Sequence, residues 1–186
     1  MTTLPILTTL AAASVVLAAC AKRSPPETGR ADPQVAEEVS RLREATRPFH
    51  ELDAAAAAGY AREVRDCLVH EHHGAMGYHH VNRGYVDENV ELERPEILLY
   101  ERRPDGGYRL NGVEFIVPYT ARPREAAPPV LMRRQLQRDD NLKIWYLHVW
   151  AWRENPDGIF ANFHPDVTCP ASARKVFVPF EDKSPH

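Results

Sequence analysis

The spacing of apolar side chains predicts a helix at the start of the folded part of the chain. From residue 34 onward these side chains recur every three or four residues, which places them on one helical face. They are Val35, Val39, Leu42 and Ala45. Asp32 and Pro33 suit the cap and first turn of such a helix. Pro48 disfavours the helical conformation at the residue before it, so we expect an end near Thr46. Thr46 is then expected to cap a second helix that runs to Gly59.

Beyond residue 60 the pattern predicts mainly strands, with two further short helices. Residues 63–74 are expected to form a helix that ends at its glycine, and residues 131–138 another. Residues 97–103 and 108–119 are rich in β-branched and aromatic side chains around a Pro-Asp-Gly-Gly turn, which predicts a β-hairpin. Residues 143–153 give the strongest strand signal. Helices first, strands later and no βαβ alternation predict an α+β fold, with N-terminal helices followed by a mainly antiparallel sheet.

The segments before and after these elements define the expected domain organisation. We expect one globular domain over residues 34–170 and a C-terminal tail over residues 171–186. Residues 20–33 contain proline, serine and glycine without apolar periodicity, which is typical of a flexible spacer. Residues 1–19 carry no charged side chain and resemble an export signal.

The apolar stretch from Leu4 to Ala19 is only 16 residues long, short of the roughly 20 that span a bilayer. It ends in Leu-Ala-Ala followed by Cys20, which closely resembles the lipobox of bacterial lipoproteins. That resemblance implies a lipid on Cys20, which becomes the mature N-terminus and anchors an extracytoplasmic protein to a membrane of the cell envelope. An ordinary signal peptide or an uncleaved anchor is the alternative.

Two cysteines remain if Cys20 carries lipid. Cys67 and Cys169 would then lie in an oxidising compartment, where a disulfide is the simplest assignment. The alternative is a pair of thiolate metal ligands, although neither residue has the short Cys-x-x-Cys spacing of a metal knuckle.

Composition narrows the class of partner. The chain has 23 Lys+Arg against 26 Asp+Glu, a formal net charge of -3, so it lacks the basic excess of nucleic-acid-binding proteins. Its 44% hydrophobic content excludes a disordered protein. Sixteen prolines against nine glycines predict a loop-rich domain.

Histidine is the residue with unusual local density. Five of the nine histidines lie between residues 70 and 80, and imidazole is a ligand for zinc, copper, iron and nickel. We assign His70, His72 and His73 to the last turn of the expected helix, where they interact favourably with the helix C-terminus without metal. In an extended segment His79 and His80 point to opposite faces, and His79 shares the smaller, more apolar face, so we select it as the ligand.

Two further side chains complete a candidate metal site. Glu114 interrupts a strongly apolar strand, where a carboxylate must face solvent, pair with an arginine or bind a cation. His148 lies among aromatic residues of the last strand, where the alternative is a hydrogen-bonded core residue. With His79 they supply two imidazoles and a carboxylate, a set that suits zinc or copper with positions left open. Proton competition near pH 6.5 is expected to weaken such a site.

Three functions are consistent with these residues. The first is a non-catalytic, exported domain that binds a divalent metal; the second is a metal-dependent enzyme that uses the same three side chains. The third is a cell-wall carbohydrate module built on Trp150 and Trp152, which share a face if the strand is regular. A buried aromatic core is the simpler expectation for these indoles, because the strand is apolar on both faces. Motifs of a particular reaction, such as Gly-x-Ser-x-Gly or His-Glu-x-x-His, do not occur in the sequence.

Three sequence blocks carry a resemblance to a known family. They are GYHHVN at residues 77–82, VEFIVP at 113–118, and LHVWAW at 147–152 followed by NPDGIF and Cys169. Over about residues 49–169 the chain resembles an uncharacterised family of exported bacterial proteins. The resemblance implies an exported domain with Cys67 and Cys169 paired, and it implies no particular reaction.

Overall fold

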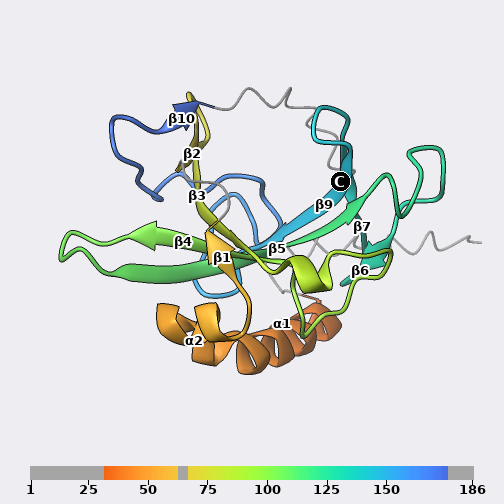
Figure 1. The fold of residues 1–186 in the computed structure, drawn as a ribbon, viewed down its shortest axis with the longest axis horizontal. Coiled ribbons are helices and arrows are strands. Elements are labelled where there is room, and N and C mark those ends of the chain that lie inside the picture. The colour runs from red at the N-terminus through yellow and green to blue at the C-terminus, as the bar shows by residue number, and fades with distance from the viewer. Residues whose placement is uncertain (1–31, 63–66, 176–186) are drawn as a thin grey trace, which may run out of the picture. The chain divides into compact units, whose positions relative to one another are not determined.

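The computed structural model describes residues 32–62 and 67–175 (Figure 1). These residues form an α+β unit with one long helix and a curled, mainly antiparallel sheet, as the order of elements predicts. The helical elements are α1 (Pro33–Thr46), the 3-10 turns η1 (Arg47–His50) and η2 (Arg83–Tyr85), and α2 (Leu52–Ala57). The strands are β1 (Ala61–Arg62), β2 (Leu68–His70), β3 (Gly74–Val81), β4 (Ile97–Arg102), β5 (Tyr108–Pro118), β6 (Val130–Leu131), β7 (Arg134–Gln135), β8 (Gln137–Asp139), β9 (Ile144–Val149) and β10 (Arg174–Lys175).

The main sheet has the strand order β10-β2-β3-β4-β5-β9-β8, and β1 pairs with the far end of β3. Its neighbours are antiparallel except β10 and β2, which run parallel. Strand β10 lies inside the segment that the sequence suggests as a tail, so the folded domain continues past residue 170.

Helix α1 begins where the sequence predicts. The Asp32 side chain accepts a hydrogen bond from the Gln34 backbone N–H, and Pro33 occupies the first turn. At the other end, Thr46 does not cap a second helix: its hydroxyl donates to the Leu42 carbonyl of its own helix. The expected second helix is therefore a 3-10 turn and then α2, which is only six residues long.

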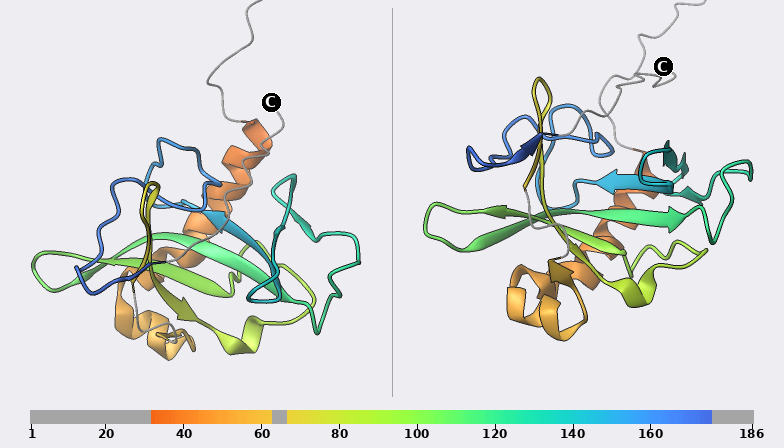
Figure 2. Two further views of the ribbon diagram at one scale, coloured as in Figure 1. Left: turned by 90° about the horizontal axis from the view of Figure 1, so that it is seen from above. Right: turned by 45° about the horizontal axis from the view of Figure 1, so that its top comes forward.

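The helices cover one face of the sheet. Figure 1 places α1 and α2 below the sheet, and in the right-hand view of Figure 2 the blue chain that follows β9 lies above it. On the helical side, Val39 and Leu42 of α1 belong to one buried apolar cluster with Val113, Phe115 and Leu147 of the sheet. The opposite face holds smaller apolar clusters, and it is the face that carries the candidate metal ligands.

The predicted hairpin and last strand are confirmed, as β4, β5 and β9. Two predicted helices are wrong. Where residues 63–74 are described, they form β2 and a turn, because Leu68, Val69 and His70 pair with β3. Residues 131–138 form β6, β7 and part of β8.

The turn between β6 and β7 explains the second error. Met132 and Arg133 both adopt left-handed backbone conformations, with φ of 50° and 60°. Two successive residues with positive φ are what a two-residue hairpin of type I′ requires, and the usual Asn-Gly signal is absent from this turn. The turn chemistry was therefore not recognisable from residue type.

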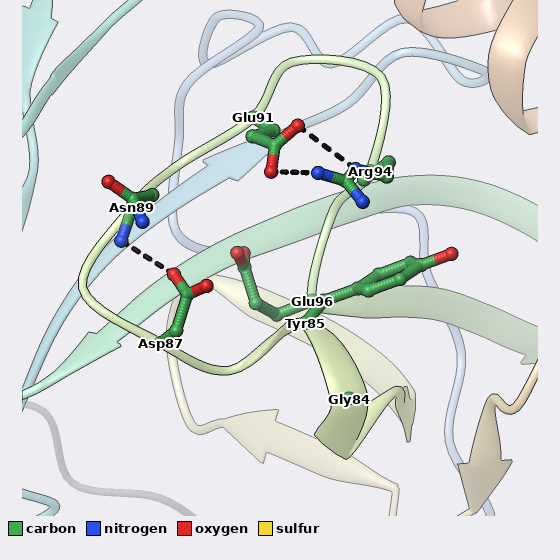
Figure 3. Close-up of a pocket in the computed structure, with 7 residues that line it drawn as sticks. All are labelled: Gly84, Tyr85, Asp87, Asn89, Glu91, Arg94 and Glu96. Atoms are coloured by element: carbon green, nitrogen blue, oxygen red, sulfur yellow. Dashed lines mark hydrogen bonds and ion pairs between the residues drawn. The ribbon is translucent and has the colours of Figure 1, made fainter.

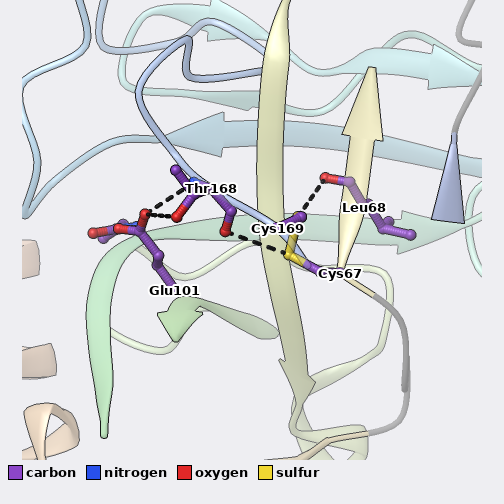
Figure 4. The surroundings of a disulfide bond; sticks show 6 residues. Cys67, Leu68, Glu101, Thr168 and Cys169 are labelled. Atoms are coloured by element: carbon purple, nitrogen blue, oxygen red, sulfur yellow. Dashed lines mark hydrogen bonds between the residues drawn. A yellow bond between two sulfur atoms is a disulfide. The ribbon is translucent and has the colours of Figure 1, made fainter. Parts of the chain in front are cut away.

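Cys67 and Cys169 form the expected disulfide, with 5.7 Å between their Cα atoms (Figure 4). It joins the residue before β2 to the chain that follows β9. Beside it, the backbone N–H and hydroxyl of Thr168 both donate to the Glu101 carboxylate, which also pairs with Arg109 and Arg153. The covalent bond and this buried carboxylate thus hold the returning chain against the sheet.

Among the described residues, none of the helices has both the length and the apolar composition needed to cross a membrane. The expected signal segment and Cys20 lie outside the described residues.

Candidate metal centre

Strand register brings the three predicted ligands to one face of the sheet. Glu114 of β5 lies directly opposite His148 of β9. On its other side Glu114 pairs with Ile97 of β4, and two residues along β4 Leu99 pairs with His79 of β3. Because residues two apart on a strand share a face, His79, Glu114 and His148 project from the same side.

The three side chains converge. His79 Nε2 is 3.4 Å from Glu114 Oε2, and His148 Nε2 is 3.8 Å from the same oxygen. One ligand atom from each residue lies within 4.8 Å of the others. Donors bound to one zinc ion at about 2.0 to 2.2 Å are separated by about 3.4 Å in a tetrahedral site. The two contacts to Glu114 are close to that separation, whereas the widest pair of ligand atoms, at up to 4.8 Å, is farther apart than in a loaded site.

The site is enclosed in protein. His79, Glu114 and His148 are 4%, 6% and 1% exposed. Val81, Ile97 and Leu99 form an apolar cluster on the same face, with Ile116 packed against it. This burial removes the water that would otherwise solvate a charged carboxylate or imidazolium.

Burial sets the protonation of all three groups. Desolvation, with a smaller contribution from the nearby Glu96 carboxylate, raises the pKa of Glu114 to about 8. Desolvation lowers the pKa of His79 to about 4 and that of His148 to about 3. At neutral pH the metal-free group therefore consists of two neutral imidazoles and a protonated carboxyl, and the close contacts are not ion pairs.

His148 is incompletely satisfied as a polar group. Neither of its ring nitrogens makes a hydrogen bond of normal geometry within the described residues. Asn162 approaches the ring and offsets a small part of the pKa depression. A buried imidazole with both nitrogens unbonded is uncommon in folded proteins, because its desolvation is not offset.

Polar residues beside His148 lead toward the surface. The Asn162 side-chain amide donates to the Tyr146 hydroxyl at 3.2 Å and to Oε1 of the Gln137 side chain at 3.3 Å. The Tyr146 ring meets the His148 ring edge-on, with centroids 5.6 Å apart. Gln137 lies on β8, at the edge of the sheet. Sequence reasoning missed this group, since Asn162 joins it from a loop whose path no periodicity specifies.

Glu96 is a second buried carboxyl that the sequence analysis overlooked. It lies just before the start of β4 and is 1% exposed. Its Oε2 accepts a hydrogen bond from the Ile116 backbone N–H. Desolvation raises its pKa to about 8. Glu96 reaches a small cavity of about 40 Å³ that the loop after η2 encloses, beside Asp87 and the paired side chains of Glu91 and Arg94 (Figure 3). The only sequence signal was a charged residue directly before an apolar strand.

His80 occupies the opposite face from His79, as the alternation of a strand requires. Its ring lies 4.7 Å from that of Tyr100, on the helical side of the sheet. His79 shares its face with Glu114 and His148, and His80 is also buried, at 8% exposure. The reason is that helices cover one face and the chain after β9 covers the other.

The histidines assigned to a helix end lie elsewhere. His70 is the last residue of β2, and His72 and His73 belong to the turn that follows. A helix dipole therefore cannot account for them.

The carbohydrate platform is not formed. Trp150 is 1% exposed, and its indole N–H donates to the Ala161 carbonyl. Trp152 instead donates to the Thr46 hydroxyl of α1 and packs against His50, on the helical side. The two indoles separate because β9 ends at Val149 and the chain bends.

No protein-family model, no curated protein and no solved structure matches this chain.

Proposed function

We propose that this chain is a lipid-anchored, extracytoplasmic domain that binds one divalent transition metal through His79, Glu114 and His148. The observation that carries the proposal is the convergence of three buried donors from three different strands. Two imidazole nitrogens face one carboxylate oxygen at 3.4 and 3.8 Å. The His148–Glu114 contact needs to close by only a few tenths of an ångström to match ligands on one ion, and the three ligand atoms all lie within 4.8 Å of one another.

The donor set selects the class of metal. Two imidazoles with one carboxylate suit zinc or copper, whereas calcium and magnesium prefer oxygen ligands alone. Both imidazoles are already uncharged at neutral pH, which is the form that binds metal. Only Glu114 would have to lose a proton, and the resulting carboxylate would offset part of the charge of the ion.

Export is supported by the disulfide and by the sequence. The bond between Cys67 and Cys169 is of the kind that persists in oxidising compartments. The apolar stretch that ends in Leu-Ala-Ala-Cys20 supplies the signal and the lipid attachment site.

A metal-dependent enzyme is the second candidate. Three protein ligands leave at least one coordination position open, which is the arrangement of catalytic zinc sites. Metal binding alone remains the first proposal because all three donors are nearly fully buried, and the cavity beside Glu96 is lined by other residues. A substrate would have to reach the ion past Asn162 and Tyr146.

The test is retention of zinc by the full chain, purified in detergent without a histidine tag. After loading and exhaustive dialysis, the wild-type protein should keep one equivalent, and Glu114→Gln should keep almost none. Glu88→Gln, which changes an exposed acid in the same way, should behave as wild type. Bound zinc should also raise the melting temperature, because it binds only the folded state. Equal retention by Glu114→Gln and wild type would contradict the proposal.

A further inference from the structure

The turn between β2 and β3 carries three histidines that the buried site does not use. His70 pairs with Gly74 across the hairpin, so the residues between them project beyond the sheet. His72 is exposed, and His70 and His73 are half-buried. All three are therefore within reach of solvent.

The rings of His70 and of its two neighbours in the turn are close together, although their ring nitrogens do not converge as the ligand atoms of the buried group do. The ring centroids of His70 and His73 are 4.5 Å apart, and those of His70 and His72 are 6.1 Å apart. An imidazole bound at about 2.0 Å has its ring centre about 3 Å from the metal. Two such rings lie about 4.5 Å apart when they bind at right angles, and about 6 Å apart when they bind on opposite sides. Both observed separations fall close to this range.

We propose that His70, His72 and His73 form a second, exposed metal site that takes copper(II). Imidazole is a favoured ligand of this ion, and ligands at right angles and opposite one another match its tetragonal geometry. Copper(II) also stands at the top of the affinity order for nitrogen ligands among the divalent metals of the first row.

The surroundings favour binding at this turn. Phe163 packs against the rings of His70 and His73, with centroids 5.1 and 6.4 Å away, and so limits the directions that these rings can take.

One contact must change when the ion binds. His70 Nδ1 accepts the backbone N–H of His72 at 3.1 Å, which fixes the ring proton on Nε2. Ligation by His70 requires this ring to turn, and water can replace the exposed hydrogen bond that is lost. The site thus assembles on binding, and its copper should exchange more readily than metal in the buried centre.

The experiment is a calorimetric titration of the full chain with copper(II) sulfate, in detergent, without a histidine tag and with glycine present to suppress weak binding. Wild type should take up two equivalents, one for each site. The double variant His72→Ala/His73→Ala should lose the more weakly held equivalent, and His148→Ala should lose the tighter one. His50→Gln removes a histidine outside both clusters and should still take up two.

The variants separate the two sites. Circular dichroism should show the wild-type fold in the turn variants, because they alter side chains at a hairpin tip. If the double variant binds as much copper as wild type, the surface site is wrong. If the double variant loses one equivalent of copper while His148→Ala loses none, copper binds at the turn and not at the buried centre.

Discussion

Replacing both disulfide cysteines by serine should cost a large part of the stability of the domain. The sequence separation of Cys67 and Cys169 is 102 residues. Closing a loop of about 100 residues in the unfolded chain removes entropy equivalent to about 5 kcal/mol in the chain-entropy model. Cys67 and Cys169 pack against apolar clusters in the folded state. Placing serine hydroxyls there also lowers the free energy of unfolding, by less than the loop entropy does.

The assay is urea denaturation followed by tryptophan fluorescence, with the midpoint and slope fitted to a two-state transition. The free energy of unfolding of Cys67→Ser/Cys169→Ser should fall by about 4 to 5 kcal/mol relative to the oxidised wild type. Wild type in excess reductant should match the double variant. Thr168→Val is the local control: it keeps the disulfide but removes the hydroxyl bond to Glu101, at a cost of about 1 kcal/mol. A loss below about 1 kcal/mol in the double variant would refute the reasoning.

Three other predictions concern buried groups near the sheet. Glu96→Gln should make the free energy of unfolding less pH-dependent. In the folded wild type the pKa of Glu96 is about 8, above its ordinary 4.5. Wild type therefore loses stability as pH rises between these two values, by up to about 5 kcal/mol. Denaturation of both proteins at pH 4.5 and 8 should show that the variant is more stable than wild type only at pH 8. The same difference in stability at both pH values would count against a protonated Glu96. Gly77→Ala should prevent stable folding, since its Cβ would lie 2.4 Å from the Tyr100 carbonyl oxygen at a φ of +94°; wild-type thermal unfolding would disprove this. Zinc binding at pH 7 should release about one proton from Glu114, measurable by calorimetry in buffers of different ionisation enthalpy, and no release would show that the carboxyl is already ionised.

The last prediction changes an expectation drawn from sequence. Ordinary imidazole pKa values place the loss of metal near pH 6.5. Burial shifts His79 and His148 well below that value and shifts Glu114 above it. Protons should therefore begin to compete with the metal as the pH falls below about 8, where the Glu114 carboxylate becomes protonated.

The buried group of candidate ligands could be chosen from the sequence because two of its members contradict their own strands. Glu114 interrupts an apolar run, and His148 lies between residues that belong in a core. Alternation along a strand then assigns the face of each side chain. The order of the strands in the sheet depends on long-range pairing, which local pattern does not specify. Whether the side chains of His79, Glu114 and His148 meet was therefore a hypothesis that depended on the order of β3, β5 and β9 in the sheet.

The errors have physical causes as well. Residues 68–70 form a strand because β3 pairs with them, and local propensity carries no information about that partner. Trp152 leaves the face of Trp150 because the chain bends after Val149 and its indole finds Thr46 on α1. Glu96 and Asn162 join the site region from loops, where side-chain direction follows no period.

In the proposed metal centre, one ion binds between His79, Glu114 and His148. X-ray absorption at the zinc edge tests it most directly, on the full chain carrying His72→Ala/His73→Ala so that the surface turn contributes nothing. One retained equivalent should show two imidazole nitrogens and at least one oxygen at about 2.0 to 2.2 Å, and adding Glu114→Gln should abolish it. A retained ion without imidazole among its direct ligands, or one unaffected by Glu114→Gln, would show that metal does not bind at this centre.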